Sequence, residues 1–237
     1  MRREEGKGEE GRGWREEGQG IQTNNQPAVR RVFYFANDAY DATTVVENAH
    51  LAKWPRTLLA ISIIPFCWLA MMVVHELGHV VTAWVLGVPI EALLLHPLAL
   101  SRTDLGAHPG RLAAIWGGPL LGVALPVFWW LTSRFAKSPE WFVARFFAGF
   151  CLIANGAYLG VGWIDSIGDA GDLIRMGSPV WTLIVFGVVT VPTGFALWNG
   201  LAREFGLGKD ARPVKPGVAL GVFAALCVIV ITELAIG

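Results

Sequence analysis

The chain has 237 residues, of which 54% are hydrophobic and only 16% are charged. Soluble domains carry roughly 25% charged residues, so this composition argues against one ordinary soluble domain. Nineteen basic and nineteen acidic residues cancel, which leaves no net charge to attract nucleic acid or an acidic partner.

The first part of the chain, residues 1–53, is its polar part. Residues 1–30 are rich in Gly, Glu, Arg and Gln and contain almost no aliphatic side chains. Such a segment cannot bury enough apolar surface to offset the entropy lost on ordering. We therefore expect a largely disordered N-terminal tail over residues 1–53, followed by a second, mostly apolar domain over residues 54–237.

Five apolar stretches follow the tail, each near or above the roughly 20 residues that a helix needs to cross a bilayer. They cover residues 57–88, 111–133, 141–164, 179–201 and 218–236. Tryptophans gather at their ends, as is typical of side chains at headgroup depth. The sequence predicts an all-α polytopic protein with about five transmembrane helices. We expect a multi-pass integral protein in the plasma membrane of a prokaryote.

One break between the apolar stretches, residues 88–108, differs from the others. It contains two prolines and β-permissive residues, and it is too short for a sixth span. We expect a short re-entrant or β-like extended segment, with His96 and His108 at the interface and not among metal ligands. Extended backbone at membrane depth is tolerated only where protein or water covers it.

The second half of the first apolar stretch contains the motif HELGH at residues 75–79. Residues i and i+4 share one face of a helix, so His75 and His79 can bind one Zn²⁺. Glu76 projects close enough to take a proton from a water molecule, as a general base. Each ionisable side chain in a membrane helix costs roughly 2–3 kcal/mol, which favours a metal site over a structural polar cluster.

A catalytic zinc site has three protein ligands and one open position. The second and third spans lead away from the motif and back, so the loop after the third span returns to the motif's side. This loop contains three acids, Asp165, Asp169 and Asp172. We expect Asp165 to be a solvated loop acid, and the spacing leaves Asp169 and Asp172 open as the third ligand.

HELGH in a membrane helix, Gly117-Gly118-Pro119 in the next helix and a downstream Asp-x-Gly together resemble the site-2 protease family of intramembrane zinc metalloproteases. The resemblance covers about residues 57–175. It implies a third ligand that is an Asp followed by glycines, best matched by Asp169-Ala170-Gly171, with Asp172 as the alternative. It also implies that residues 88–108 form an edge that pairs with extended substrate.

Other polar and small residues have two interpretations. Asn155 and Tyr158 lie one turn apart and either hydrogen-bond a ligand or substrate, or join neighbouring helices; we favour the second. Gly118 and Pro119 either contact substrate or form a kink that lets helices approach. Glu233 lies near the end of the fifth span and is expected to reach the interface, because a third ligand there has no supporting motif.

The resemblance implies that residues 54–237 form a membrane-embedded metalloprotease domain, an intramembrane zinc metalloendopeptidase that hydrolyses peptide bonds of membrane-embedded or membrane-adjacent segments. It implies one Zn²⁺ per chain and membrane protein substrates; the oligomeric state is left open. The alternative is a catalytically silent zinc-binding membrane scaffold of the same family, which an intact Glu76 disfavours. A transporter would show repeats between the two halves of the chain, and the sequence shows none.

Two arguments conflict on the side of the membrane that the site faces. One set of loops is rich in basic residues, and the other contains only Arg102, Arg111 and Arg175. The positive-inside rule therefore puts the N-terminal tail in the cytosol and the zinc site towards the far face. The family resemblance suggests a site nearer the cytosol. We follow the charge count. The basic residues of the first set are Lys53, Arg56, Arg134, Lys137, Arg203, Lys209, Arg212 and Lys215.

Overall fold

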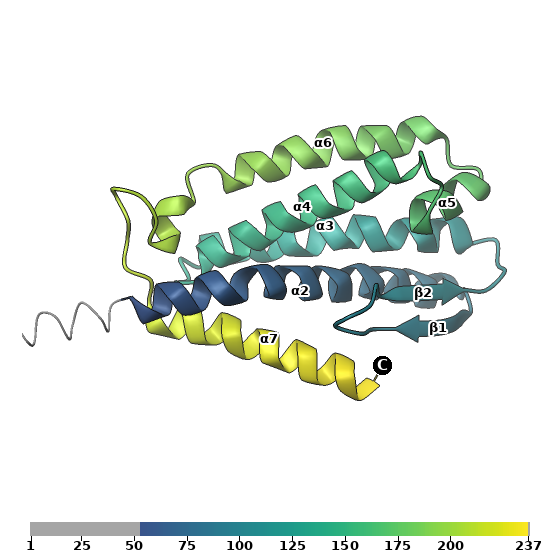
Figure 1. Cartoon of the computed structure of the whole chain (residues 1–237). Coiled ribbons are helices and arrows are strands. Elements are labelled where there is room, and N and C mark those ends of the chain that lie inside the picture. The colour runs from purple at the N-terminus through teal and green to yellow at the C-terminus, as the bar shows by residue number, and fades with distance from the viewer. Residues whose placement is uncertain (1–52, 237) are drawn as a thin grey trace, which may run out of the picture. The chain divides into compact units, whose positions relative to one another are not determined.

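The structure is a computed structural model and describes residues 53–236. The expected disorder of the tail therefore lies outside the described residues, except at Lys53. Figure 1 shows the helices running side by side, with one short hairpin next to α2. The elements are α2 (Trp54–Leu86), β1 (Ile90–Leu94), β2 (Arg102–Leu105), α3 (Arg111–Phe135), α4 (Trp141–Gly162), α5 (Gly168–Arg175), α6 (Val180–Trp198), the 3₁₀ helix η1 (Ala202–Phe205) and α7 (Pro216–Ile236).

Among these residues, α2, α3, α4, α6 and α7 are long and apolar enough to cross a membrane. This confirms the predicted helical, multi-pass membrane protein. Each helix agrees with its predicted apolar stretch to within three residues at either end. The identity of the membrane stays a prediction.

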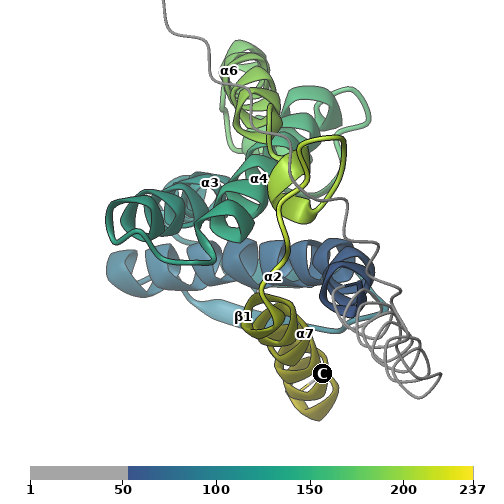
Figure 2. The same cartoon turned by 90° about the vertical axis from the view of Figure 1, so that its left-hand side faces the viewer.

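The spanning helices pack in the order α7, α2, α3, α4 and α6, and Figure 2 shows α7 below α2 and α6 at the top. Hydrophobicity alone does not drive helices together in lipid, so small residues are favoured where backbones meet. A Cβ atom added to Gly78 of α2 would lie only 2.9 Å from the Cα atom of Gly118 in α3. Likewise, a Cβ atom on Gly160 of α4 would lie 3.0 Å from the Cα atom of Gly187 in α6. These glycines let the helices approach closely.

Two clusters of buried apolar side chains stabilise the bundle. One joins α2, α4 and α7 around Cys67, Phe147 and Val222. The other joins the C-terminal part of α2 to α3, α4 and α6, and includes Ala170 and Leu173 of the short helix α5. Packing in this second cluster holds α5 against the spanning helices. The sequence interpretation of this region as a loop is wrong, because residues 168–175 form a helix.

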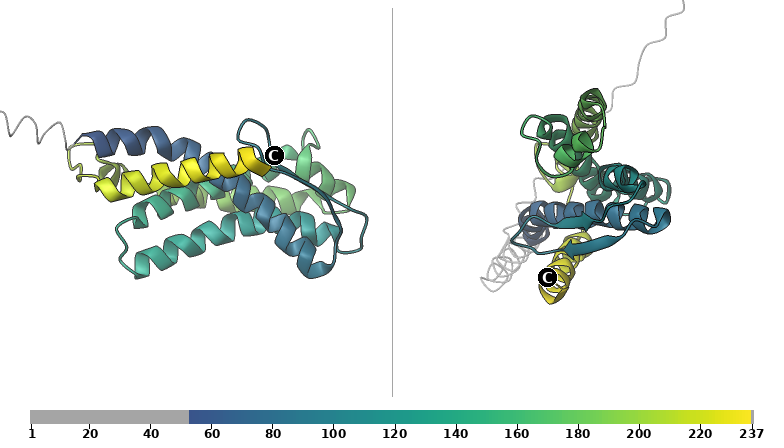
Figure 3. Two further views of the ribbon diagram at one scale, coloured as in Figure 1. Left: turned by 90° about the horizontal axis from the view of Figure 1, so that it is seen from below. Right: turned by 90° about the vertical axis from the view of Figure 1, so that its right-hand side faces the viewer.

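The break after α2 forms an antiparallel hairpin in which Leu93 of β1 lies opposite Thr103 of β2. The hairpin runs beside the C-terminal half of α2 (Figure 3). Side chains alternate between the two faces of a strand; those of Thr103 and Leu105 are more buried than Arg102. The extended structure expected for residues 88–108 is therefore present, whereas its re-entrant character stays a prediction.

Candidate metal centre

The two histidines of the HELGH motif lie one helical turn apart on α2 and face the same side. Both are buried, with 7% of His75 and 3% of His79 exposed. Their Nε2 atoms are 3.1 Å apart. α2 continues for further residues on either side of the motif, so the helix backbone sets the spacing of the two rings.

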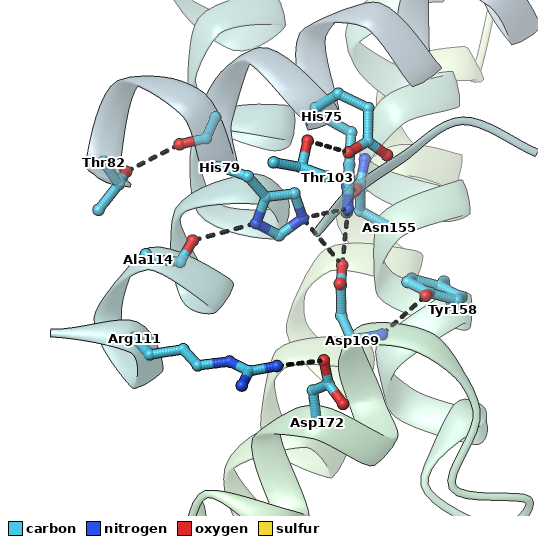
Figure 4. A network of polar contacts seen from close by, with 12 residues as sticks. His75, His79, Thr82, Thr103, Arg111, Ala114, Asn155, Tyr158, Asp169 and Asp172 are labelled. Carbon is cyan, nitrogen blue, oxygen red and sulfur yellow. Dashed lines mark hydrogen bonds and ion pairs between the residues drawn. The ribbon is translucent and has the colours of Figure 1, made fainter. Parts of the chain in front are cut away.

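The third side chain comes from α5, as Figure 4 shows. The Oδ2 atom of Asp169 lies 2.7 Å from Nε2 of His75 and 3.2 Å from Nε2 of His79. Gly168 precedes it with a φ of 55°, a conformation that favours glycine. The backbone N–H of Asp169 donates to the hydroxyl oxygen of Tyr158, 2.9 Å away. α4 therefore holds the start of α5 beside the two histidines.

The outer nitrogen of each imidazole has its own acceptor. His75 Nδ1 lies 2.6 Å from Oδ1 of Asn155, and His79 Nδ1 lies 3.0 Å from the carbonyl oxygen of Ala114. Both acceptors require the proton on Nδ1, which leaves the Nε2 lone pairs facing inward. Metal-binding histidines are usually oriented by such hydrogen bonds.

The inward-facing atoms therefore fit a cation. Two Nε2 lone pairs and a carboxylate oxygen converge with no hydrogen between them, whereas two imidazolium N–H groups 3.1 Å apart would repel each other. Asp169 contributes the carboxylate, the one side chain of the three that can carry a negative charge. The buried group His75, His79 and Asp169 could bind a metal ion, whose identity the geometry leaves open.

Glu76 follows His75 directly and is also buried, with 4% exposed. Its Oε2 atom accepts a hydrogen bond of 2.7 Å from the hydroxyl of Thr103 on β2. A carboxylate therefore lies next to the candidate metal group without being one of its three ligating side chains. This arrangement can provide a base beside a Lewis acid.

Gly118 of α3 leaves the space that the His79 ring fills. A Cβ atom at this position would lie 2.8 Å from Cδ2 of the imidazole and closer still to two other ring atoms. Pro119 is fully buried in α3. Of the two roles proposed for this pair, the structure supports the close approach of α2 and α3; contact with substrate stays a prediction.

Asn155 hydrogen-bonds the ring of His75, and the Tyr158 hydroxyl accepts a hydrogen bond from the backbone N–H of Asp169. The favoured interpretation, that they only join helices, is therefore too narrow. Asn155 does also link α4 to α2, so the two roles coincide in one side chain.

Other predicted candidates lie apart from the group. Asp172 pairs with Arg111 and Arg175, which favours Asp169 as the third ligand. His96 and His108 each accept a hydrogen bond from a backbone N–H two residues later. Glu233 is covered by neighbouring residues, with 1% exposed; its reach to the interface stays a prediction. Its carboxylate oxygens have no hydrogen-bond partner within the described part of the chain.

Three contacts in or near the site were missed from the sequence: those of the Thr103 hydroxyl, of the Ala114 carbonyl and of Arg111 with Asp172. A backbone carbonyl has no sequence signal, and the other two depend on how separate elements pack. Compared with protein-family models, curated proteins and solved structures, the chain matches none. Membership of the site-2 protease family stays a prediction.

Proposed function

We propose that the chain is an intramembrane zinc metalloendopeptidase of the site-2 protease type. The observation that carries the proposal is the convergence of His75, His79 and Asp169 beside Glu76, at the C-terminal part of a helix long enough to span a membrane. Ionisable side chains at such a place are costly. Three side chains that fit a metal ion, next to a fourth that fits a general base, are best explained by a catalytic function.

The donor set supports zinc. Two imidazole nitrogens and one carboxylate oxygen are the ligands of several zinc hydrolases, in which three protein ligands leave one position open. Bound zinc would supply Lewis acidity that polarises a peptide carbonyl and activates water. The chain's part is to hold the ion through His75, His79 and Asp169, and to fix both imidazoles through Asn155 and Ala114.

Glu76 is the proposed general base. In its ionised form it accepts the proton of the water that attacks the scissile carbonyl carbon. The same proton can then pass to the nitrogen of the departing amine as the C–N bond breaks. A metal scaffold without catalysis has no need of this carboxylate, so Glu76 favours the protease over the silent scaffold.

The proposed substrates are segments within or next to the membrane. The zinc ligands lie on α2 and on α5, close to spanning helices. A substrate helix hides its carbonyl groups in hydrogen bonds, so it must unwind locally before hydrolysis. An extended segment can pair with an exposed strand edge, and the family resemblance implies this use for the β1–β2 hairpin.

The test combines metal content with cleavage. We expect purified protein to bind one zinc per chain and to cleave a membrane-helix peptide that carries a fluorophore and a quencher. Glu76→Gln should retain the zinc and lose cleavage by several orders of magnitude. Glu140→Gln, at the start of α4, is the matched control and should change neither.

The outcomes separate the alternatives. Full cleavage by Glu76→Gln would contradict the protease mechanism. Zinc at one per chain with no cleavage of a panel of membrane-helix peptides would favour the silent scaffold. Protein that binds no zinc when reconstituted with excess ion would contradict both.

A further inference from the structure

The contact between Thr103 and Glu76 joins two elements that are separate in the chain. Glu76 lies on α2 and Thr103 on β2, 27 residues later. The Thr103 hydroxyl is the only hydrogen-bond partner that the described residues provide for this carboxylate. The bond is 2.7 Å long and partly buried. It is therefore the contact best placed to fix the orientation of the carboxylate.

The hairpin backbone holds Thr103 in place. Thr103 pairs with Leu93 of β1, which fixes the place of its backbone in the hairpin. Leu105, two residues along the same face of β2, is buried in the cluster that includes Ala83 of α2. The neighbours Arg102 and Asp104 have exposed side chains and form an ion pair with each other. One face of β2 thus packs on α2, with Thr103 directed at Glu76.

A hydrogen bond to one carboxylate oxygen has a definite consequence. A glutamate side chain rotates about three bonds, and a fixed Oε2 removes much of that freedom. The second oxygen, Oε1, then remains as the acceptor for a water proton. A reaction slows steeply when a catalytic group is displaced by a small distance. A carboxylate held in one orientation is therefore a more effective base than one that rotates freely.

We propose that Thr103 is a positioning residue that orients Glu76, and that it makes the placement of the β1–β2 hairpin a condition for proton transfer. This inference rests on the proposed function, because it assigns Glu76 as the base. It adds a link between the element expected to bind substrate and the group that acts on it. A hairpin displaced from α2 would leave the metal group intact but the base unaligned.

The contact can be measured without cleavage, by hydrogen–deuterium exchange of the hairpin amides in metal-free protein. Thr103→Val removes the donor but keeps the shape and β-branching of the side chain. We expect the β1 and β2 amides to exchange about tenfold faster, since a hydrogen bond to a charged group is lost. Glu76→Ala should give the same increase, and the double variant no more than either single one.

Conservative variants serve as controls. Thr103→Ser keeps the hydroxyl, and Glu76→Gln keeps an acceptor oxygen, so both should retain most of the protection. Asp104→Asn lies next to Thr103 but on the outer face of β2 and should leave exchange unchanged. Effects of Thr103→Val and Glu76→Ala that add up would show two independent contacts and would overturn the proposal.

Kinetics test the positioning role. We expect Thr103→Val to lower kcat about tenfold or more, with KM and zinc content unchanged, and Thr103→Ser to restore kcat. An unchanged kcat in Thr103→Val, or a loss that Thr103→Ser does not rescue, would contradict the proposal. If the unmodified chain cleaves nothing, the proposed function fails and the positioning role fails with it. The exchange data would still decide whether Thr103 anchors the hairpin to Glu76.

Discussion

His75 and Asn155 form a buried contact between α2 and α4, with Nδ1 of the ring 2.6 Å from Oδ1 of the amide. The orientation of the amide is set by its own helix, because Asn155 Nδ2 donates to the carbonyl oxygen of Cys151, 2.9 Å away. Gly122 of α3 leaves room for it: a Cβ atom there would lie 3.0 Å from Oδ1. A helix backbone thus fixes the amide, and the amide fixes the imidazole.

Asn155→Ala should therefore weaken zinc binding by about 10- to 100-fold, the usual effect of losing a hydrogen bond that orients a ligand. The ring of His75 would lose its proton acceptor and its fixed orientation. Competition with a chelator of known affinity measures the change. Asn199→Ala, at the exposed C-terminal end of α6, is the control. Equal affinities for the two variants would show that the Asn155 contact only joins helices.

Asp169→Ala should lose most of the bound zinc, because it removes the one anionic side chain of the metal group. Asp172→Ala should retain one zinc per chain, since that carboxylate pairs with Arg111 and Arg175 instead. Elemental analysis of the two purified variants decides between them. The reverse result would move the third ligand by about one turn of α5 and would break the match with Asp169-Ala170-Gly171.

Gly118→Ala should lower zinc affinity strongly although the residue is not a ligand. The added methyl group would overlap the His79 ring, so either the ring rotates away or α3 separates from α2. Gly221→Ala in α7 is the matched control, because a Cβ atom there meets nothing within 4 Å. Both variants are compared by chelator competition and by thermal unfolding. Tight zinc binding by Gly118→Ala would show that the ring can shift without loss.

Much of this arrangement could be predicted because it depends on local patterns. The lengths of the apolar stretches predicted the spanning helices, and the i, i+4 spacing placed His75 and His79 on one face. The even number of crossings after α2 placed the acids after α4 at the same end of the bundle. The expectation that Asp169 lies near the two histidines needed only this parity and the Asp-x-Gly match.

The remaining features depend on packing between separate elements, which local sequence patterns do not indicate. Residues 168–175 contain two glycines, which disfavour a helix, yet buried Ala170 and Leu173 hold α5 in helical form against its neighbours. Thr103 faces Glu76 because of the hairpin register, and one residue of slip would turn it outward. The burial of Glu233 likewise depends on how α7 packs, and its position near the end of the fifth span did not predict it.

Glu233→Leu should stabilise the protein in detergent, raising the temperature of unfolding by a few degrees. The carboxylate is buried without a hydrogen-bond partner among residues 53–236, and burial of an unpaired polar group costs free energy. Glu233→Gln should gain less, since its amide stays buried. Zinc content should be unchanged in both. A clear loss of stability in Glu233→Leu would show that the carboxyl group makes a contact that the folded chain needs.

The last prediction concerns orientation. The N-terminal end of α2, the α3–α4 turn and the segment from η1 to α7 lie at one end of the bundle, and the hairpin and α5 lie at the other (Figure 1). The first end holds eight of the basic residues named above and the second only three. All three at the second end are paired with acids, Arg102 with Asp104 and the other two with Asp172.

The positive-inside rule therefore predicts that the metal centre faces away from the cytosol. Single cysteines at the exposed positions Asp165 and Lys209 test this by labelling intact cells with a membrane-impermeant maleimide. We expect Asp165→Cys to react and Lys209→Cys to react only after the membrane is opened. The parent chain gives the background, since Cys67 and Cys151 are buried and Cys227 lies within α7. The opposite pattern would place the site towards the cytosol, as the family resemblance implies, and would mean that the basic loops do not set the topology.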